Sequence, residues 1–287
     1  MSAKTLVGIV LVGAVLLASG GFVAAAGPAV AGQIECHGLT VTVRGTSGDD
    51  VITGTPGDDV IHGFGGHDNI DGMGGDDVIC GGVGRDQLRG GPGEDVLDGG
   101  GGVDWVSYLG TPGGVTVDLW KGTASGAAGA DTVVAIENIK GSGHADKLLG
   151  SGGSNHIKGL GGNDYLYSRG ADDIVRGGGG NDHIRGGPGD DRLHGGDGTD
   201  FVAHPKSDTP VVVDLRIGSA TGEGDDRLFG FEHAKGSPFD DVVHGDAGDN
   251  KLWGFAGDDQ LFGHGGTDWA DGGDGTDVCA VETPVNC

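Results

Sequence analysis

Aliphatic residues recur at every ninth position along most of the chain, and each follows an acidic or amide residue by two places. In the seven consecutive nonapeptides from Gly45 to Ser107, this position is filled by Ile52, Ile61, Ile70, Ile79, Leu88, Leu97 and Val106. The end of each nonapeptide, one aliphatic residue between two variable ones, predicts a very short strand with that side chain turned inward. Because a single unit cannot bury its aliphatic residue alone, the fixed period predicts a solenoid of stacked units.

The full nonapeptide reads Gly-Gly-x-Gly-x-Asp-x-aliphatic-x, and its phase returns in two further blocks, at residues 141–203 and 236–280. Across 19 units, position six is Asp in 17 and Asn in the other two, Asn155 and Asn250. Position four is Gly in 16 units, the exceptions being His144, Ala171 and Phe239. A merely biased composition would scatter Asp over all nine columns, so the fixed columns indicate a repeated structure.

Two long gaps separate the three blocks, and they are related to each other. Tyr108–Lys140 and His204–Lys235 both contain an alternating Val-x-Val-x-Leu stretch, which predicts strand rather than helix. Asp118 and Asp214 lie 96 residues apart, and Glu137 and Glu232 lie 95 apart, so a larger unit of about this length is duplicated. We expect the gaps to form wider β coils that continue the solenoid. Glu137 and Glu232 are then either extra metal ligands or hydrogen-bond acceptors between coils.

The N-terminal segment Met1–Ala31 has the layout of a secretory signal peptide. Lys4 precedes an apolar run from Leu6 to Leu17, and a cleavage site of the A-x-A type follows at residues 29–31. The alternative is an uncleaved membrane anchor, which the glycines and Pro28 after the apolar run disfavour. After it, Gln33–Arg44 alternates Leu39, Val41 and Val43 and predicts a strand that caps the solenoid.

These patterns predict a linear order of segments. They are a signal peptide (1–31), an N-terminal cap strand (32–44), a first repeat block (45–107), a β-rich insert (108–140), a second block (141–203), a second β-rich insert (204–235), and a third block with a C-terminal cap (236–287).

The chemistry of the repeat points to calcium. Glycine-rich turns leave backbone carbonyls bare, and with one carboxylate per turn they form a set of hard oxygen donors that suits Ca²⁺ better than Mg²⁺. Burying one aliphatic side chain yields ~1.5–3 kcal/mol, whereas ordering nine backbone units costs ~9–18 kcal/mol. The formal charge of −26, from 43 acidic and 17 basic residues, further opposes compaction. The sequence therefore predicts a fold that depends on several calcium ions. The predicted ligands are Asp50, Asp59, Asp68, Asp77, Asp86, Asp95, Asp104, Asp164, Asp173, Asp182, Asp191, Asp200, Asp259, Asp268 and Asp277.

Gly81–Arg89 and Gly177–Arg185 resemble the RTX, or haemolysin-type, calcium-binding repeat almost letter for letter, and the resemblance extends from about Gly45 to Ala280. It implies an all-β, right-handed parallel β-roll with two nonapeptides per coil and calcium between the turns of adjacent coils. Aspartates two nonapeptides apart would then share an ion, such as Asp59 with Asp77, Asp68 with Asp86, or Asp77 with Asp95. The units with His144, Ala171, Phe239, Asn155 or Asn250 depart from the pattern, and calcium is less expected there.

Four cysteines in a chain predicted to be secreted suggest two disulfides. Cys279 with Cys287 is the easier pair because the two are close in sequence, which leaves Cys36 with Cys80. A redox-active site is not expected, since no C-x-x-C is present. The tryptophans Trp105, Trp120, Trp253 and Trp269 are expected as core or cap residues rather than as a platform for carbohydrate.

No catalytic motif accompanies the repeats. The sequence has no H-E-x-x-H and no G-x-S-x-G, and an acidic chain with a pI near 4.4 repels nucleic acid and anionic membranes. The first hypothesis is a secreted calcium-binding module with a structural or interaction role, no catalysis and no membrane span once the signal is removed. The second is an extracellular adhesin or matrix protein that binds glycans or cell surfaces. The third is a polysaccharide-modifying enzyme that uses Asp118, Asp214, Glu137 and Glu232 of the inserts.

Overall fold

The computed structural model describes residues 34–287, so the predicted signal peptide lies outside the described residues. These residues form strands and turns without any helix. One sheet has 14 strands: β4 (Val51–Thr53), β6 (Asn69–Asp71), β8 (Gln87–Arg89), β10 (Trp105–Ser107), β14 (Asn138–Lys140), β16 (His156–Gly161), β18 (Ile174–Gly179), β20 (Arg192–Asp197), β22 (Val212–Asp214), β23 (Ser219–Thr221), β24 (Asp225–Phe229), β26 (Val242–His244), β28 (Gln260–Phe262) and β30 (Val278–Ala280). The other has 15: β3 (Val43–Arg44), β5 (Val60–Gly65), β7 (Val78–Gly84), β9 (Val96–Gly102), β11 (Val115–Asp118), β12 (Thr123–Gly126), β13 (Gly129–Val134), β15 (Lys147–Leu149), β17 (Tyr165–Tyr167), β19 (His183–Arg185), β21 (Phe201–Ala203), β25 (His233–Lys235), β27 (Lys251–Ala256), β29 (Trp269–Asp274) and β31 (Thr283–Val285).

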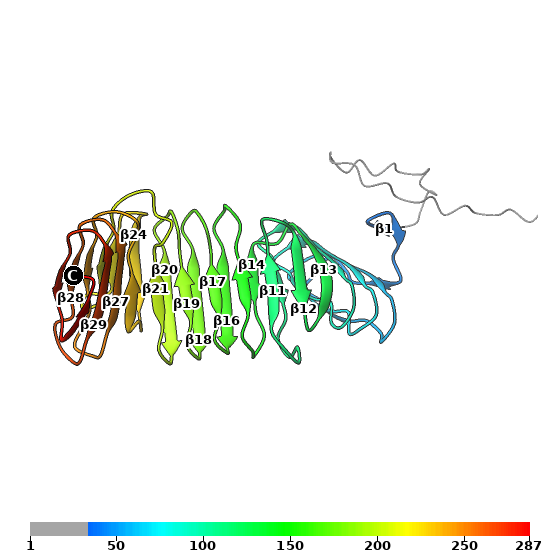
Figure 1. Cartoon of the computed structure of the whole chain (residues 1–287). Coiled ribbons are helices and arrows are strands. Elements are labelled where there is room, and N and C mark those ends of the chain that lie inside the picture. Colours follow the sequence, from blue (N-terminus) through cyan, green and yellow to red (C-terminus); the bar gives the residue numbers. More distant parts are fainter. Residues whose placement is uncertain (1–33) are drawn as a thin grey trace, which may run out of the picture. The chain divides into compact units, whose positions relative to one another are not determined.

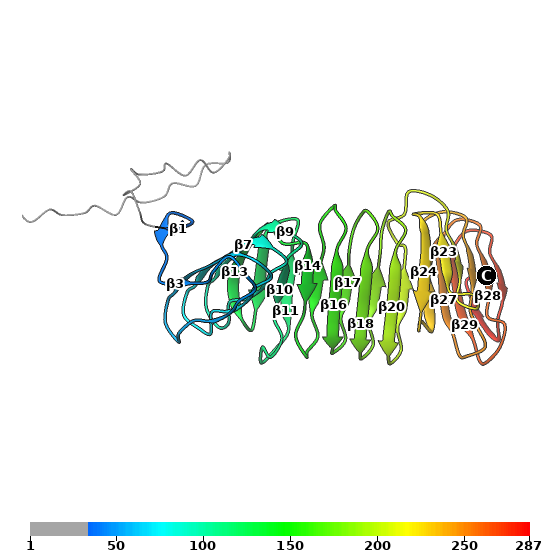
Figure 2. The same cartoon turned by 180° about the vertical axis from the view of Figure 1, so that it is seen from behind.

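Two nonapeptides make one coil, as the resemblance implied. Each nonapeptide contributes one strand, and successive nonapeptides alternate between the two sheets, so that a strand pairs in parallel with the strand 18 residues further on. Val60 is in register with Val78 on one sheet, and Ile174 with Arg192 on the other. The predicted β-solenoid is therefore confirmed. Figures 1 and 2 show its coils following one another in chain order.

The hydrophobic core is a double column of aliphatic side chains between the two sheets. The residue at position eight faces inward in almost every unit, and Ile61, Ile79 and Leu97 are fully buried on the 15-stranded sheet, as Ile70 and Leu88 are on the other. Positions seven and nine flank this residue and so point outward, because side chains alternate along a strand. Each coil thus buries only two aliphatic side chains.

This alternation overturns the expectation for most of the tryptophans. Trp105 and Trp269 occupy position seven and Trp253 occupies position nine, so all three lie half-buried on the outer faces of the sheets instead of in the core. Trp120 lies in the first insert with 71% of its surface exposed.

The inserts are β-rich as predicted, but they are not simply wider coils. In the first insert, β11, β12 and β13 form an antiparallel meander, of which β13 pairs in parallel with β9 and β11 with β15. The second insert repeats this arrangement with β22, β23 and β24 between β20 and β26. The first meander lies in the 15-stranded sheet and the second in the 14-stranded sheet. The duplicated unit is therefore displaced by half a coil.

The N-terminal cap differs from the single strand that was predicted. β1 (Glu35–Cys36) and β2 (Leu39–Thr40) form an antiparallel hairpin, and the chain joins the solenoid only at β3. The turn between β1 and β2 at His37-Gly38 has positive φ at both residues, which breaks the strand there. Both predicted disulfides are present, Cys36–Cys80 and Cys279–Cys287, and they fasten the two ends. Within residues 34–287, no helix has the length and apolar character needed to span a bilayer.

Candidate metal centre

The position-six carboxylates form rows along both edges of the solenoid. The backbone N–H of each residue donates to the Oδ1 atom of the residue 18 positions later: the N–Oδ1 distance is 2.8 Å from Asp59 to Asp77 and 2.9 Å from Asp68 to Asp86. All the predicted ligands belong to such rows, which are Asp50–Asp68–Asp86–Asp104, Asp59–Asp77–Asp95, Asp146–Asp164–Asp182–Asp200, Asn155–Asp173–Asp191, Asp241–Asp259–Asp277 and Asn250–Asp268. The structure thus brings together the aspartate pairs that the resemblance implied.

The rows continue into the inserts and the C-terminal cap. Glu137 accepts the N–H of Asp104, and Glu232 accepts that of Asp200, so both glutamates act as hydrogen-bond acceptors between coils. Sequence reasoning missed three further members of the rows, Asp131, Asp226 and Glu282. A signal existed for Asp131, which follows Asp95 by 36 residues and so keeps the nine-residue phase.

In twelve loops the second carboxylate oxygen is buried and has no hydrogen-bond partner. These Oδ2 atoms belong to Asp68, Asp77, Asp86, Asp95, Asp104, Asp164, Asp173, Asp182, Asp191, Asp200, Asp259 and Asp268. In each of these loops the residue at position two has positive φ, whether it is glycine or not, as at Gly82 (φ 114°), Met73 (φ 82°) and Leu160 (φ 85°). The loop of Asp277 shares this backbone conformation through Gly273. We call these twelve loops, together with the loop of Asp277, the open loops.

In the other six loops the same oxygen is already occupied. Position two is Thr, Ser or Asp there, does not have positive φ, and its backbone N–H donates to the side chain at position six. In the loop of Asp59, for example, the Thr55 N and Oγ1 atoms lie 2.6 and 2.9 Å from Oδ2. We call these the closed loops; their position-six residues are Asp50, Asp59, Asp146, Asn155, Asp241 and Asn250. They make up the first coil of each repeat block.

Burial raises the pKa of several open-loop carboxylates. Loss of hydration raises the pKa of Asp77 to about 6, with repulsion from Asp59 and Asp58 adding to the effect. The pKa of Asp95 rises to about 7 and that of Asp191 to about 8, for the same reason and because of like-charged neighbours. The backbone N–H that each of these carboxylates accepts offsets only part of this effect, and a nearby cation would stabilise the charged form further.

The glycine at position one lets the carboxylate and a carbonyl oxygen of the next coil converge. A Cβ atom added at Gly63 would collide with Oδ2 of Asp68 and with the carbonyl oxygen of Gly81, one coil further on. The same arrangement holds at Gly159, where Asp164 and the carbonyl of Gly177 converge. Every donor at these points is oxygen, the carboxylate oxygen lacks a partner, and neighbouring coils both contribute. These residues fit a hard cation such as Ca²⁺.

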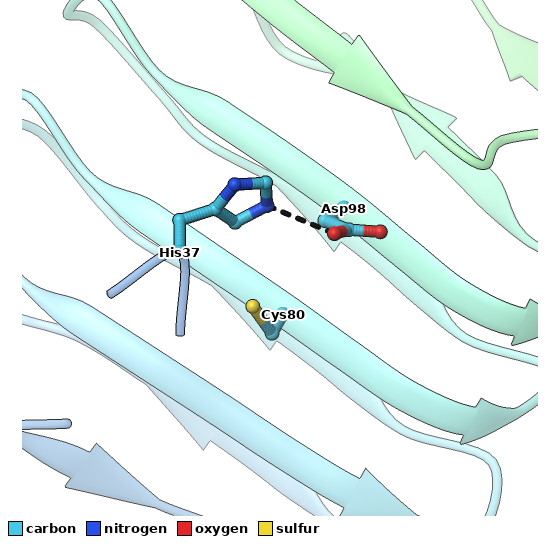
Figure 3. A group of neighbouring side chains, drawn as sticks. All are labelled: His37, Cys80 and Asp98. Carbon is cyan, nitrogen blue, oxygen red and sulfur yellow. Dashed lines mark hydrogen bonds and ion pairs between the residues drawn. The ribbon is translucent and has the colours of Figure 1, made fainter. Parts of the chain in front are cut away.

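Within residues 34–287, His37, Cys80 and Asp98 form one other group of potential metal ligands (Figure 3). The sulfur of Cys80 is bonded to Cys36 and offers no thiolate. His37 Nε2 lies 2.8 Å from Asp98 Oδ2, so the group links the N-terminal hairpin to β9 by an ion pair or hydrogen bond instead of forming a metal site.

The four acids considered as catalytic residues of the inserts do not form one site. Asp118 lies on β11 and accepts a hydrogen bond from Arg169 at 2.8 Å, while Asp214 lies on β22 in the other sheet and pairs with Arg216. Glu137 and Glu232 are bound to backbone N–H groups, as described above. No two of these four acids share an interaction in the described residues.

Comparison with known proteins agrees with this geometry. The family model of the RTX calcium-binding nonapeptide repeat matches residues 44–79, 80–108, 140–175, 169–202, 235–270 and 259–280, which together cover more than half of the chain. No curated protein matches the chain.

Proposed function

The chain belongs to the family of RTX calcium-binding repeat proteins, and we propose that it acts as a secreted structural or interaction module whose β-solenoid folds on binding calcium. It would have no catalysis of its own. The observation that carries the proposal is the set of twelve buried carboxylate oxygens without a partner, spaced along both edges of the solenoid.

We assign calcium to the open loops. The Oδ2 atoms of the open-loop aspartates would hold the ion together with backbone carbonyls such as those of Gly81 and Gly177, which face the same points. Calcium supplies positive charge and a flexible coordination of ~6–8 oxygens, so it joins the loops of neighbouring coils without demanding strict geometry. Asp50 and Asp59 lie in closed loops, where Thr46 and Thr55 occupy the oxygen that calcium would need.

The energetic role of calcium follows from the thin core. Each coil buries two aliphatic side chains, and the chain carries a formal charge of −26. A site with a dissociation constant near 10⁻⁴ M in millimolar calcium adds about 1.4 kcal/mol to stability. Several such sites together reach the ~5–15 kcal/mol that an ordinary domain requires. Calcium is then part of the folded structure.

A calcium titration followed by far-ultraviolet circular dichroism tests this proposal. In EDTA we expect a largely unfolded spectrum, and added calcium should produce a cooperative change to β structure. Asp182→Asn should weaken calcium binding and shift the midpoint to higher calcium. The matched control is Asp146→Asn in the same row, where Ser142 occupies the carboxylate and the midpoint should stay. A spectrum that does not respond to EDTA would refute calcium-dependent folding.

Secretion is proposed from the composition of residues 1–31, with Lys4, the apolar run and the A-x-A site. The two disulfides, Cys36–Cys80 and Cys279–Cys287, support it because such bonds persist in oxidising compartments, and the extracellular space also supplies millimolar calcium. Mass spectrometry of the protein recovered from culture medium tests this. An N-terminus at or near Gly32 is expected, and retention of Met1 in a membrane fraction would contradict secretion.

A further inference from the structure

Five basic residues lie in two neighbouring groups on the outer face of the 14-stranded sheet. Lys140 on β14, Lys158 on β16 and Arg176 on β18 are directly in register from strand to strand. Arg192 on β20 and Arg227 on β24 are in register with each other, but Arg192 lies opposite Ile174 of β18, two residues away from the place opposite Arg176. We call these five residues the basic ladder. It holds five of the 17 lysines and arginines of a strongly acidic chain.

The charges of the basic ladder are not neutralised by the protein. Arg89, Arg169, Arg185 and Arg216 form ion pairs with carboxylates, but in residues 34–287 no member of the ladder does. Like charges directly opposite one another in a sheet are destabilising. Burial, together with repulsion from Arg176 and Lys140, lowers the pKa of Lys158. The ladder therefore places cations without a carboxylate partner side by side, and an anionic ligand would relieve the repulsion between them.

The shape of the ladder restricts the ligand. Within each of its two in-register groups, Lys140–Lys158–Arg176 and Arg192–Arg227, neighbouring cations are separated by the strand spacing of about 4.8 Å, close to the length of one sugar unit in an extended chain. Beside Arg192 and Arg227 it is bordered by a row of exposed carboxylates, Asp172, Asp190 and Asp225, linked by backbone-to-carboxylate hydrogen bonds. A duplex nucleic acid with a charge every ~1.7 Å, or a flat anionic membrane, would also face these carboxylates. A narrow chain with well-spaced charges avoids them.

Aromatic rings extend the basic ladder at its N-terminal end. Trp105 on β10 lies half-buried beside β14, with Lys158 Nζ 4.8 Å from its ring centroid and His156 edge-on at 4.9 Å. An indole ring on a flat sheet offers an apolar surface against which a sugar ring packs. Cations in register next to a half-buried indole ring suit a carboxylated sugar chain better than a simple inorganic anion.

From these observations we propose that the basic ladder binds a linear acidic polysaccharide, with carboxylate groups on successive cations. This goes beyond the calcium-dependent module proposed above and does not depend on which loops hold calcium. It requires only that the solenoid is folded.

Fluorescence anisotropy with a labelled oligogalacturonate tests the proposal, with calcium held constant and folding checked by circular dichroism. We expect Lys158→Gln/Arg176→Gln to weaken binding about tenfold, whereas the charge-conserving Lys158→Arg/Arg176→Lys retains it. The matched control is Arg44→Gln/Lys206→Gln, which changes the net charge equally at exposed positions outside the ladder. Binding of the wild-type protein should also weaken as salt is raised.

Three outcomes would overturn the proposal. They are unchanged binding after the ladder substitution, equal loss in the control variant, and equally tight binding of a neutral dextran oligosaccharide. Tighter binding of single-stranded DNA or of anionic vesicles through the same two residues would assign the ladder to another class of partner. If the glutamine variant fails to fold, the comparison of wild-type binding to oligogalacturonate and to neutral dextran decides.

Discussion

The residue at position two of each nonapeptide sets the direction of its own backbone N–H, and this direction distinguishes open from closed loops. With positive φ, as at Met73 and Gly82, the N–H does not reach the following aspartate. With Thr, Ser or Asp at the same position, the N–H and the side chain both engage the position-six residue. The columns of Gly, Asp and aliphatic residues were readable in the sequence. The role of position two was not, because a small polar residue in a glycine-rich turn looks like a neutral replacement.

Met73→Thr should convert an open loop into a closed one. Met73 precedes Asp77 and lies one coil after Thr55, whose loop is closed. The new N–H and hydroxyl bonds to Asp77 should take up its free oxygen, lower calcium uptake measured by equilibrium dialysis, and stabilise the calcium-free protein by about 1 kcal/mol. The matched control is Met73→Leu, since Leu160 occupies the equivalent place in another open loop. Equal calcium uptake by both variants would refute the role of position two.

At the scale of elements, the inserts preserve the rows of hydrogen-bonded acids while changing the topology. The alternating valines predicted strands correctly, and Val115, Val117 and Val213 are buried as such a pattern requires. The direction of the strands was not predictable, because alternation gives the inward face and not the pairing partner. β12 and β23 run antiparallel to their neighbours, so each insert adds a meander within one sheet. After each meander, Glu137 and Glu232 accept a backbone N–H from the preceding coil and so continue the rows of hydrogen-bonded acids.

Substitutions of Glu137 separate its two predicted roles. If the side chain only accepts the N–H of Asp104, Glu137→Gln should keep both stability and calcium binding, because an amide oxygen accepts equally well. Glu137→Ala should leave that N–H without a partner and lower the free energy of unfolding in calcium by about 1–3 kcal/mol. Urea denaturation at fixed calcium measures both. A loss of calcium binding in the glutamine variant would instead show that Glu137 is a ligand.

At the scale of the whole molecule, the balance between acidic charge and cations decides whether the solenoid forms. The sequence already showed the excess of acids and the small number of aliphatic residues per coil. It did not show that the position-six carboxylates are buried, with Asp77 and Asp182 fully inaccessible. Burial follows from the stacking of coils, in which each carboxylate accepts an N–H from the coil before it. Charge placed there is costly without calcium, and protonation is the other way to remove it.

Acid should therefore partly replace calcium. In the calcium-free solenoid burial raises the pKa of Asp164 to about 7 and of Asp191 to about 8, compared with about 3.9 in an unfolded chain. Because the folded-state pKa is raised, these groups favour folding while they are protonated, and that contribution is lost as the pH rises from about 4 through 7–8. In EDTA we expect more β structure at pH 5 than at pH 8, measured by circular dichroism.

The buried groups can be separated from general charge repulsion by a matched pair of variants. Asp191→Asn removes a buried carboxylate and should weaken the pH dependence in EDTA, since the amide is neutral throughout. Asp190→Asn removes the same charge at an exposed position next to it and should leave the pH dependence close to that of the wild-type protein. In calcium at pH 8 we expect Asp191→Asn to need more calcium to fold than the wild-type protein, because it has lost an open-loop ligand. Equal behaviour of the two variants would mean that net charge, and not the buried rows, controls folding.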